Sequence, residues 1–240
     1  MTRVKICGCM SVADAVAAKD AGADFIGVMF ADSRRRLSID EAAQIVRAVG
    51  GPLGDIEQQS PPVHVPADES VVSWFAHGAS ALDRLLAQKR PLVVGVFEDQ
   101  PAEEVNEICD EARLDLVQLS GSEPWSDIAA LNRQAIKVIR TREGMTSGEM
   151  MSAVDANTSL AVMLDDSRGT GVAGDWGVAR ELAMRMPLWL AGGLTPDNVA
   201  SAIETVRPWA VDVSSGVETS GAKDAAKIAA FVRAAKGVRV

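Results

Sequence analysis

Short, nearly continuous apolar runs alternate with longer amphipathic stretches along the chain, and this alternation restricts the possible fold more than any other feature. Eight such runs occur, at 3–7, 25–30, 92–97, 114–119, 135–139, 160–164, 188–192 and 209–213. Continuous apolar runs rich in β-branched residues are typical of parallel strands that are covered on both faces. The intervening stretches at 11–22, 38–50 and 195–206 indicate helices, and we expect the last to begin at Thr195.

Eight strand–helix units in 240 residues predict an α/β fold, a single (β/α)8 TIM barrel that occupies residues 1–240. An open, doubly wound sheet is the alternative. That fold usually carries a Gly-rich turn, GxGxxG, after its first strand, whereas this chain has "CGCMSV" there. The sequence therefore favours the barrel.

Residues 51–89 interrupt the alternation between the second helix and the third strand. Residues 51–69 hold four of the ten prolines and show no helical or strand period, whereas 70–89 could form one helix or two short ones. A loop of this length needs an explanation in a compact domain. We expect a solvated insertion with an extra helix packed on the outside of the barrel, at the end opposite the catalytic face. An interaction element is the alternative.

The composition excludes several classes of protein. A net charge of −9 argues against a nucleic-acid or anionic membrane surface as the main partner. No run approaches the roughly 20 apolar residues that a membrane helix needs, and no secretory leader is recognisable. Three cysteines form no disulfide framework, which favours a reducing, cytoplasmic location. With only two histidines, acid–base chemistry would depend on carboxylates, thiols or lysines.

Polar residues at the ends of the predicted strands are the candidates for chemistry, because barrels of this kind bind ligands at the C-terminal ends of their strands. Cys7 ends the first strand and Asp165 follows the sixth. A ligand between them could receive a proton on one side and lose one on the other, as an isomerisation requires. The alternative is that Cys7 is a small buried apolar residue, which is the commoner role of a cysteine.

Glycines and serines follow the seventh and eighth predicted strands, where barrels often bind phosphate. The residues are Gly192 and Gly193 in one loop and Ser214, Ser215 and Gly216 in the other. Glycines allow the backbone to approach an anion, and serine hydroxyls add hydrogen-bond donors. The pattern predicts a phosphate site, and tight turns with a capping serine are the alternative.

Other charged residues leave more than one interpretation open. The run Arg34–Arg36 after the second strand could bind a carboxylate or could simply be a solvated loop. Lys5 and Lys137 could form a Schiff base in an aldolase or could be ion-pair partners. Asp165 and Asp166 have no clustered histidine or further carboxylate, so we expect no metal site.

Several motifs together resemble the phosphoribosylanthranilate isomerase family of tryptophan biosynthesis. They include "VKICG" at 4–8, "VQLSGSEP" at 117–124, "LDDSRGTGVAGDW" at 164–176, "LAGGLTPDNV" at 190–199 and "RPWAVDVSSGVE" at 207–218. The resemblance spans nearly the whole chain, and its motifs occur in the family's order. The resemblance replaces the apolar interpretation of Cys7 with a catalytic one.

The resemblance implies a cofactor-independent Amadori rearrangement of N-(5′-phosphoribosyl)anthranilate to 1-(2-carboxyphenylamino)-1-deoxyribulose 5-phosphate. By position in the motifs, Asp165 would be the general acid and Cys7 the general base. Arg35 would hold the anthranilate carboxylate, and Asp212 and Gln118 would orient the sugar.

The resemblance also implies a phosphate site and a small phosphorylated molecule as the ligand, with the protein a monomer or a homodimer. The residues of that site would be Gly169, Thr170, Gly171, Gly192, Gly193, Ser214, Ser215 and Gly216. The chain differs from the family pattern at Met10 and at Ser120, which replaces a histidine. A non-catalytic phospho-ligand-binding protein, or another sugar-phosphate isomerase or aldolase on the same barrel, is therefore the alternative.

Overall fold

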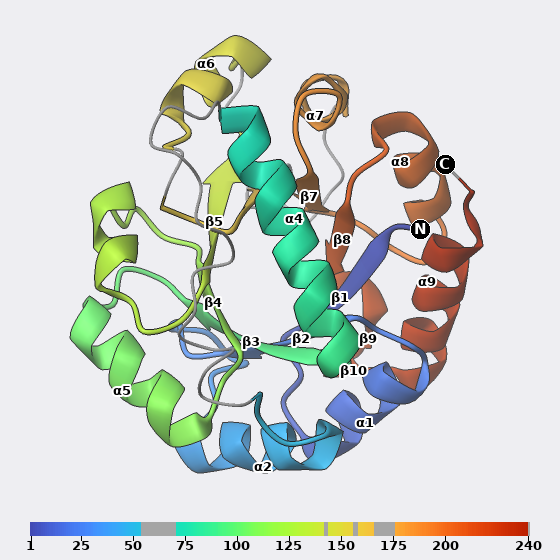
Figure 1. Cartoon of the computed structure of the whole chain (residues 1–240). Coiled ribbons are helices and arrows are strands. Elements are labelled where there is room, and N and C mark those ends of the chain that lie inside the picture. The colour runs from blue at the N-terminus through green and yellow to red at the C-terminus, as the bar shows by residue number, and fades with distance from the viewer. Residues whose placement is uncertain (54–70, 142–143, 156–157, 166–175, 240) are drawn as a thin grey trace.

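The computed structural model describes residues 1–53, 71–141, 144–155, 158–165 and 176–239, and eight parallel strands within these ranges close a barrel (Figure 1). The strands pair in chain order, and β8 pairs with β1 to complete the ring. They are β1 Arg3–Cys7, β2 Phe25–Met29, β3 Leu92–Phe97, β4 Leu116–Leu119, β5 Ala135–Arg140, β6 Ala161–Asp165, β7 Leu188–Ala191 and β8 Ala210–Val213. Each strand lies at one of the eight apolar runs, which confirms the predicted barrel.

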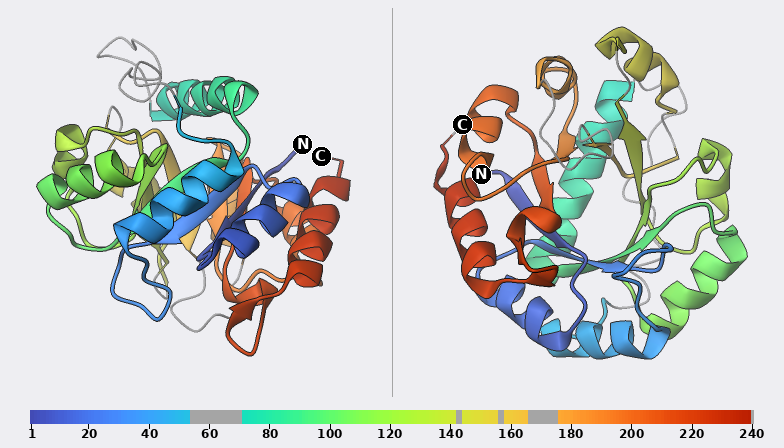
Figure 2. Two further views of the ribbon diagram at one scale, coloured as in Figure 1. Left: turned by 90° about the horizontal axis from the view of Figure 1, so that it is seen from below. Right: turned by 180° about the vertical axis from the view of Figure 1, so that it is seen from behind.

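Helices surround this ring, as the two views of Figure 2 show. They are α1 Val12–Asp20, α2 Ile39–Val49, α4 Val71–Gln88, α5 Ala102–Ala112, α6 Ser147–Ala153, α7 Gly177–Ala183, α8 Val199–Val206 and α9 Ala225–Gly237, with 3-10 turns η1 Trp125–Ala130 and η2 Ser215–Val217. After η2, the short strands β9 Glu218–Thr219 and β10 Ala222–Lys223 form a hairpin. Within the described ranges, no helix has both the length and the apolar character needed to cross a membrane.

The helix expected to begin at Thr195 begins later, at Val199, so that prediction was wrong at its start. Residues 196–198 form a turn instead, and Asn198 holds it. The Asn198 side chain accepts a hydrogen bond from the Thr195 N–H (2.8 Å) and donates one to the Gly193 carbonyl (3.0 Å). Asn198 therefore fixes the loop after β7 rather than only capping α8.

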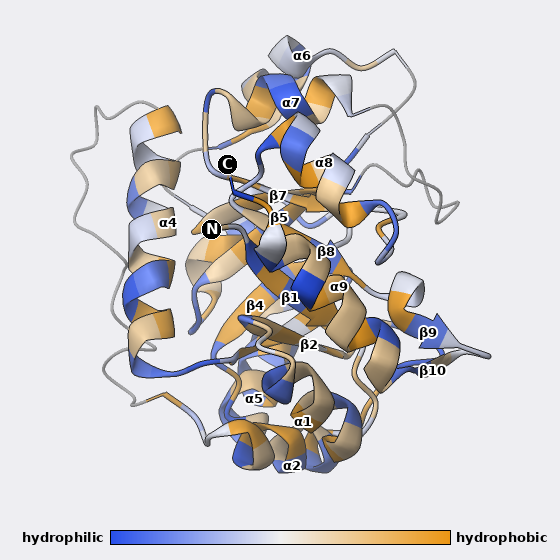
Figure 3. Ribbon diagram, turned by 90° about the vertical axis from the view of Figure 1, so that its right-hand side faces the viewer, coloured by the Kyte–Doolittle hydropathy of each residue, from blue (hydrophilic) through white to orange (hydrophobic). Residues whose placement is uncertain are grey.

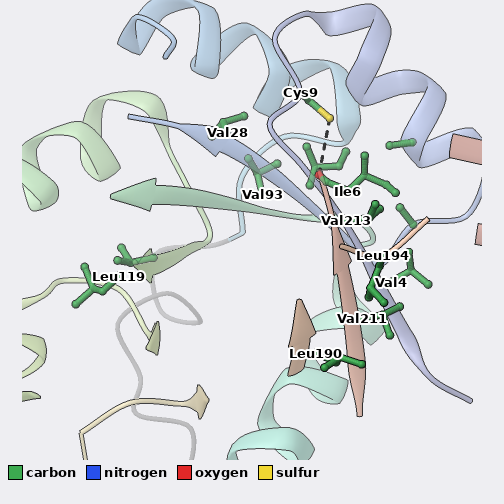
Figure 4. Close-up of a cluster of buried hydrophobic side chains, with 14 of the residues drawn as sticks. Val4, Ile6, Cys9, Val28, Val93, Leu119, Leu190, Leu194, Val211 and Val213 are labelled. Atoms are coloured by element: carbon green, nitrogen blue, oxygen red, sulfur yellow. Dashed lines mark hydrogen bonds between the residues drawn. The ribbon is translucent and has the colours of Figure 1, made fainter. Parts of the chain in front are cut away.

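Side chains alternate between the two faces of each strand and so form two separate cores. Val4 and Ile6 of β1 contribute to the core that lies between the strands and the helices, and Figure 4 shows part of it. Cys9 belongs to this outer core, where its thiol donates to the Ile6 carbonyl at 3.8 Å. Lys5 and Cys7, the intervening residues of β1, therefore lie on the inner face of the strand.

Aromatic side chains fill the N-terminal end of the barrel interior. The ring of Trp189 lies 4.6 Å from that of Phe25 and 5.5 Å from that of Trp209, measured between ring centroids. Leu82 and Leu86 of α4 belong to the same buried cluster. This end of the barrel is thus closed by apolar packing.

Within the insertion, the structure describes residues 51–53, helix α4 and residue 89. Helix α4 lies across this N-terminal end of the barrel (Figure 1). Figure 3 shows α4 at one end of the molecule and the β9–β10 hairpin at the other. Arg3 binds Asp83 at 2.6 Å, and the Trp74 indole donates to the Ser159 carbonyl at 2.7 Å. Between α2 and β3 the chain thus forms one continuous helix that closes the N-terminal end of the barrel, whereas residues 54–70 of the insertion lie outside the described residues.

Gly78 allows α4 to approach the barrel closely, and replacing it tests this contact. A Cβ at Gly78 would lie 2.0 Å from the Leu160 carbonyl oxygen, which belongs to the backbone and cannot move aside easily. We predict that Gly78→Ala lowers the free energy of unfolding by about 1–3 kcal/mol in a urea titration, because the helix must shift.

Gly148→Ala in α6 is the matched control. A Cβ there would meet only the Thr146 hydroxyl, at 3.9 Å. Alanine should raise stability by up to about 1 kcal/mol there, because it favours helix. Equal effects of the two substitutions would show that α4 does not pack on the barrel as described.

Candidate active site

A cavity of about 240 Å³ lies at the C-terminal end of the barrel, opposite α4. Six residues selected from the sequence line it: Cys7, Arg35, Gln118, Asp165, Asp212 and Ser214. They come from β1, β4, β6 and β8 and from the loops after β2 and β8. Side chains alternate between the inner and outer faces of a strand. On β1, β4, β6 and β8, the last side chain on the inner face is a thiol, an amide or a carboxylate, so these four groups meet at the C-terminal end of the barrel.

The other residues predicted to bind phosphate do not line this cavity in the described part of the chain. Gly192, Gly193, Ser215 and Gly216 are not among its lining residues, although they adjoin Ala191 and Ser214, which are. A Cβ at Gly216 would lie 1.9 Å from the Leu194 carbonyl oxygen, so the loops after β7 and β8 touch. Residues 169–171 lie outside the described residues.

Cys7 shares the inner face of β1 with a fully buried lysine. Lys5 donates from Nζ to Asp212 Oδ1 at 2.9 Å, and Lys5 and Asp212 are register partners on the paired strands β1 and β8. Cys7 is the register partner of Gly27 on β2. A Cβ at Gly27 would lie 2.8 Å from the Cys7 sulfur and 3.1 Å from Lys5 Nζ, so a glycine here leaves room for both.

The ionisation of Cys7 depends on competing effects. Burial is the largest effect and raises the pKa of the Cys7 thiol, so that this pKa lies above that of a free thiol. The interaction with the Lys5 ammonium lowers it, with a smaller contribution from Lys223, whereas the charge of Asp212 raises it. Burial also lowers the pKa of Lys5, but Asp212 and Cys7 outweigh burial, and the pKa of Lys5 is raised. Lys5 therefore remains an ammonium group beside the sulfur. Burial raises the pKa of Cys9, in the outer core, to about 12.

Arg35 is the arginine of the run that faces the cavity. It lies over Gly8, where a Cβ would be 2.6 Å from Arg35 Cδ, and Gly8 has a φ of +71°, which favours glycine. Arg34 is half-exposed and donates to the Gly221 carbonyl, and Arg36 is exposed. The solvated interpretation of the run thus fits Arg36, whereas Arg35 lines the cavity.

Glu218 connects this arginine with the loop after β8. Arg35 donates to both Glu218 carboxylate oxygens, from Nε at 2.8 Å and from Nη2 at 3.2 Å, and Arg34 also pairs with Glu218. Lys223 Nζ donates to Glu218 Oε1 at 3.0 Å and to the Ser214 carbonyl at 2.9 Å. One carboxylate therefore links the arginine of the cavity with the serine of the loop after β8.

Polar groups also line the far side of the cavity, across from Cys7. Gln118 donates from Nε2 to the Ser120 hydroxyl at 3.0 Å, whereas its Oε1 is buried and accepts no hydrogen bond within the described residues. Arg140 is the register partner of Asp165 and donates to Glu98 at 2.8 Å. Glu98 and Arg140 also line the cavity.

Sequence reasoning missed Glu98, Arg140, Glu218 and Lys223. Arg140 could have been found as the polar residue that ends the fifth inner face, and Glu218 as the last residue of "VSSGVE". Of the two lysines considered for a Schiff base, Lys137 is in contact with Glu123 (2.6 Å) and does not line the cavity. Among the described residues, no three His, Cys, Asp or Glu side chains gather as a metal site would require.

A (β/α)8 barrel with a thiol, carboxylates and an arginine around one cavity at its C-terminal end is typical of the (β/α)8-barrel enzymes, which carry their active sites at that end. The family model of N-(5′-phosphoribosyl)anthranilate (PRA) isomerase matches residues 57–234. An N-(5′-phosphoribosyl)anthranilate isomerase from Roseiflexus sp. (strain RS-1) is 41% identical over 240 residues, which cover 98% of each chain.

Solved structures agree with this match. Monomers generated from the dimeric phosphoribosylanthranilate isomerase of Thermotoga maritima have a TM-score of 0.73 and 29% identity, over 99% of this chain and all of theirs. A phosphoribosylanthranilate isomerase in complex with reduced 1-(o-carboxyphenylamino)-1-deoxyribulose 5-phosphate has a TM-score of 0.71 and 30% identity over the same shares. The chain belongs to the N-(5′-phosphoribosyl)anthranilate isomerase family, the isomerases of tryptophan biosynthesis.

The Glu218 contacts predict a specific dependence of stability on pH. Burial opposes ionisation of Glu218, but hydrogen bonds from Arg35, Lys223 and Arg34 and the charge of Lys223 outweigh burial and lower its pKa to about 2. A depressed carboxyl pKa adds stability above the unfolded value, and this stability is lost as the pH falls through the folded value. The free energy of unfolding should therefore fall less steeply from about pH 5 to about pH 2 in Glu218→Gln than in the wild type.

Glu111→Gln, at an exposed position of α5, is the control for this measurement. Its pH dependence, followed by urea titrations across the same range, should match that of the wild type. If Glu218→Gln behaved like this control, the Glu218 contacts would not stabilise the folded protein.

Proposed function

We propose that this chain catalyses the Amadori rearrangement of N-(5′-phosphoribosyl)anthranilate by acid–base catalysis with Asp165 and Cys7. The observation that carries the proposal is that a thiol from β1 and a carboxylate from β6 line one cavity with an arginine and a loop serine. Two proton-transferring groups from different strands allow a ligand to exchange protons at two positions. The matching family model and the relative bound to a reduced product analogue support the choice of substrate.

In the first step, the Asp165 carboxyl group donates a proton to the ribose ring oxygen. The bond between that oxygen and C1′ breaks, and the nitrogen lone pair forms the C1′=N bond of a protonated Schiff base. Asp165 ends β6 and is partly buried beside Arg140, within reach of the cavity. After this step Asp165 is a carboxylate, whose negative charge the neighbouring guanidinium would stabilise.

In the second step, the Cys7 thiolate removes the proton from C2′. The C–H bond breaks and an S–H bond forms, while the electron pair moves through C1′ to neutralise the Schiff-base nitrogen. The product is an enolamine, which takes up a proton at C1′, loses the proton of its 2′-hydroxyl group and becomes the aminoketose. Because the thiolate is the active form, this step should become faster as the pH rises toward the pKa of Cys7.

The remaining groups would hold the two ends of the substrate. Arg35 would bind the anthranilate carboxylate through the N–H groups that Glu218 does not occupy, since its Nε and one Nη2 N–H already donate to Glu218, which fixes the direction of the guanidinium. Gln118 Oε1 would accept a hydrogen bond from a sugar hydroxyl, and Asp212 would orient the sugar or the base. The phosphate would bind to the loops after β6, β7 and β8, at Gly169, Thr170, Gly171, Gly192, Gly193, Ser214, Ser215 and Gly216.

An aldolase that acts through a lysine Schiff base is less consistent with these contacts. A lysine must be neutral to attack a carbonyl, whereas Lys5 is paired with Asp212 and its pKa is raised. Lys137 is paired with Glu123 away from the cavity. A cytoplasmic location and the choice between a monomer and a homodimer stay predictions.

Turnover measured through the loss of phosphoribosylanthranilate fluorescence, with substrate generated in situ, tests the proposal. We predict that Cys7→Ser and Asp165→Asn each lower kcat by about 10²–10⁴-fold, the usual contribution of a general acid or base. Thermal stabilisation by inorganic phosphate should persist in both variants, because neither residue belongs to the proposed phosphate site.

Cys9→Ser is the matched control, since Cys9 faces the outer core and a hydroxyl can replace its hydrogen bond to Ile6. It should turn over substrate within a few-fold of the wild type. Phosphate binding without turnover in the wild type would instead support the non-catalytic binding protein, and undiminished turnover in Cys7→Ser would remove Cys7 from the mechanism.

A further inference from the structure

Lys5 is a buried charged group that the proposed mechanism does not use as a reactant. We propose that Lys5 is a positioning residue whose ammonium group stabilises the thiolate of Cys7, while Asp212 holds that ammonium in place. This inference rests on the proposed function, in which Cys7 is the general base. It assigns to Lys5 an electrostatic role and no proton transfer.

Strand geometry brings the two groups together. Lys5 and Cys7 are two residues apart on β1, so their side chains extend from the same, inner face. The Lys5 ammonium and the Cys7 sulfur lie close to one position, since a Cβ at Gly27 would be 3.1 Å from Lys5 Nζ and 2.8 Å from the Cys7 sulfur. Residue 27 on the neighbouring strand is a glycine, so no side chain separates the two groups. A Cβ at this position would overlap with the sulfur.

A buried lysine normally loses its proton, since burial disfavours the charged form. Asp212 prevents this loss, because its carboxylate accepts a hydrogen bond from Lys5 Nζ at 2.9 Å. The Lys5 side chain is fully buried, and that of Asp212 is 10% exposed. An ion pair this deeply buried adds little net stability in most proteins. The position of this pair, beside a thiol that lines the cavity, gives it an effect on that thiol instead.

Other charges near Cys7 act less directly. Lys223, on β10, lowers the pKa of the thiol less than Lys5 does, and Asp212 on β8 raises it. Arg35, from the loop after β2, lies over Gly8 and directs its guanidinium to Glu218. Lys5 shares the inner face of β1 with Cys7 and is fully shielded from solvent, where charges interact most strongly, and it lowers the pKa of the thiol more than Lys223 does.

The proton balance of the reaction is unchanged by this role. When the C2′–H bond breaks, the proton moves to the Cys7 sulfur and the electron pair moves to the Schiff-base nitrogen. Lys5 keeps its proton before and after this step, because Asp212 remains its partner. The ammonium therefore stabilises the reactive thiolate, and its influence on the sulfur weakens once the thiol has formed.

The direct test is the pH dependence of Cys7 alkylation by iodoacetamide, with the modified cysteine identified by peptide mass spectrometry. Lys5→Met should move the alkylation midpoint to higher pH and lower the rate at about pH 8 by at least threefold. The double variant Lys5→Met/Asp212→Asn removes both charges and leaves no unpaired buried carboxylate. It should show a smaller shift in the same direction, even if the single variant does not fold.

Lys137→Met/Glu123→Gln is the matched control, because it removes another buried lysine–carboxylate pair that does not line the cavity. It should leave the Cys7 midpoint unchanged. An unchanged midpoint in the folded Lys5 variants, or an equal shift in the control, would overturn the inference. Because alkylation requires no substrate, failure of the proposed function would appear separately, as turnover that survives in Cys7→Ser.

Discussion

The pairing of β1 with β8 is the constraint on which the rest of the structure depends, because it closes the barrel and brings the two ends of the sequence together. This contact places Lys5 opposite Asp212, more than 200 residues away along the chain. Cys7 extends from the same face as Lys5, and Ser214 follows β8. Cys7, Asp212 and Ser214 therefore line one cavity only when the ring is closed.

The two ends of the barrel have different physical roles. At the N-terminal end, Phe25, Trp189 and Trp209 pack together beneath α4, so that apolar burial supplies stability there. At the C-terminal end, the same inner faces terminate in polar groups, which interact with one another through Glu218 and through the Lys5–Asp212 pair. Stability and chemistry are thus separated along the barrel axis, which allows the site to carry buried charge.

Much of the fold was predictable, because fully covered parallel strands appear as continuous apolar runs. The strand ends also made Cys7 and Asp165 candidates, and both line the cavity, but only the family resemblance favoured a catalytic interpretation of Cys7. Arg140 was missed because the fifth apolar run was taken to end at 139, one residue before it, and Glu98 because it follows β3 and lies outside the apolar run. The path of α4 across the barrel could not be predicted either, since it depends on the shape of the surface around Leu160.

The central claim is that Cys7 and Asp165 act on one ligand held by Arg35 at one end and by the phosphate loops at the other. A crystal structure of this chain with reduced 1-(o-carboxyphenylamino)-1-deoxyribulose 5-phosphate tests it most directly. The account predicts the Cys7 sulfur beside C2′, the Asp165 carboxylate beside the oxygen derived from the ribose ring, and the Arg35 guanidinium on the analogue's carboxylate. An analogue bound with its sugar carbons away from either Cys7 or Asp165 would contradict it.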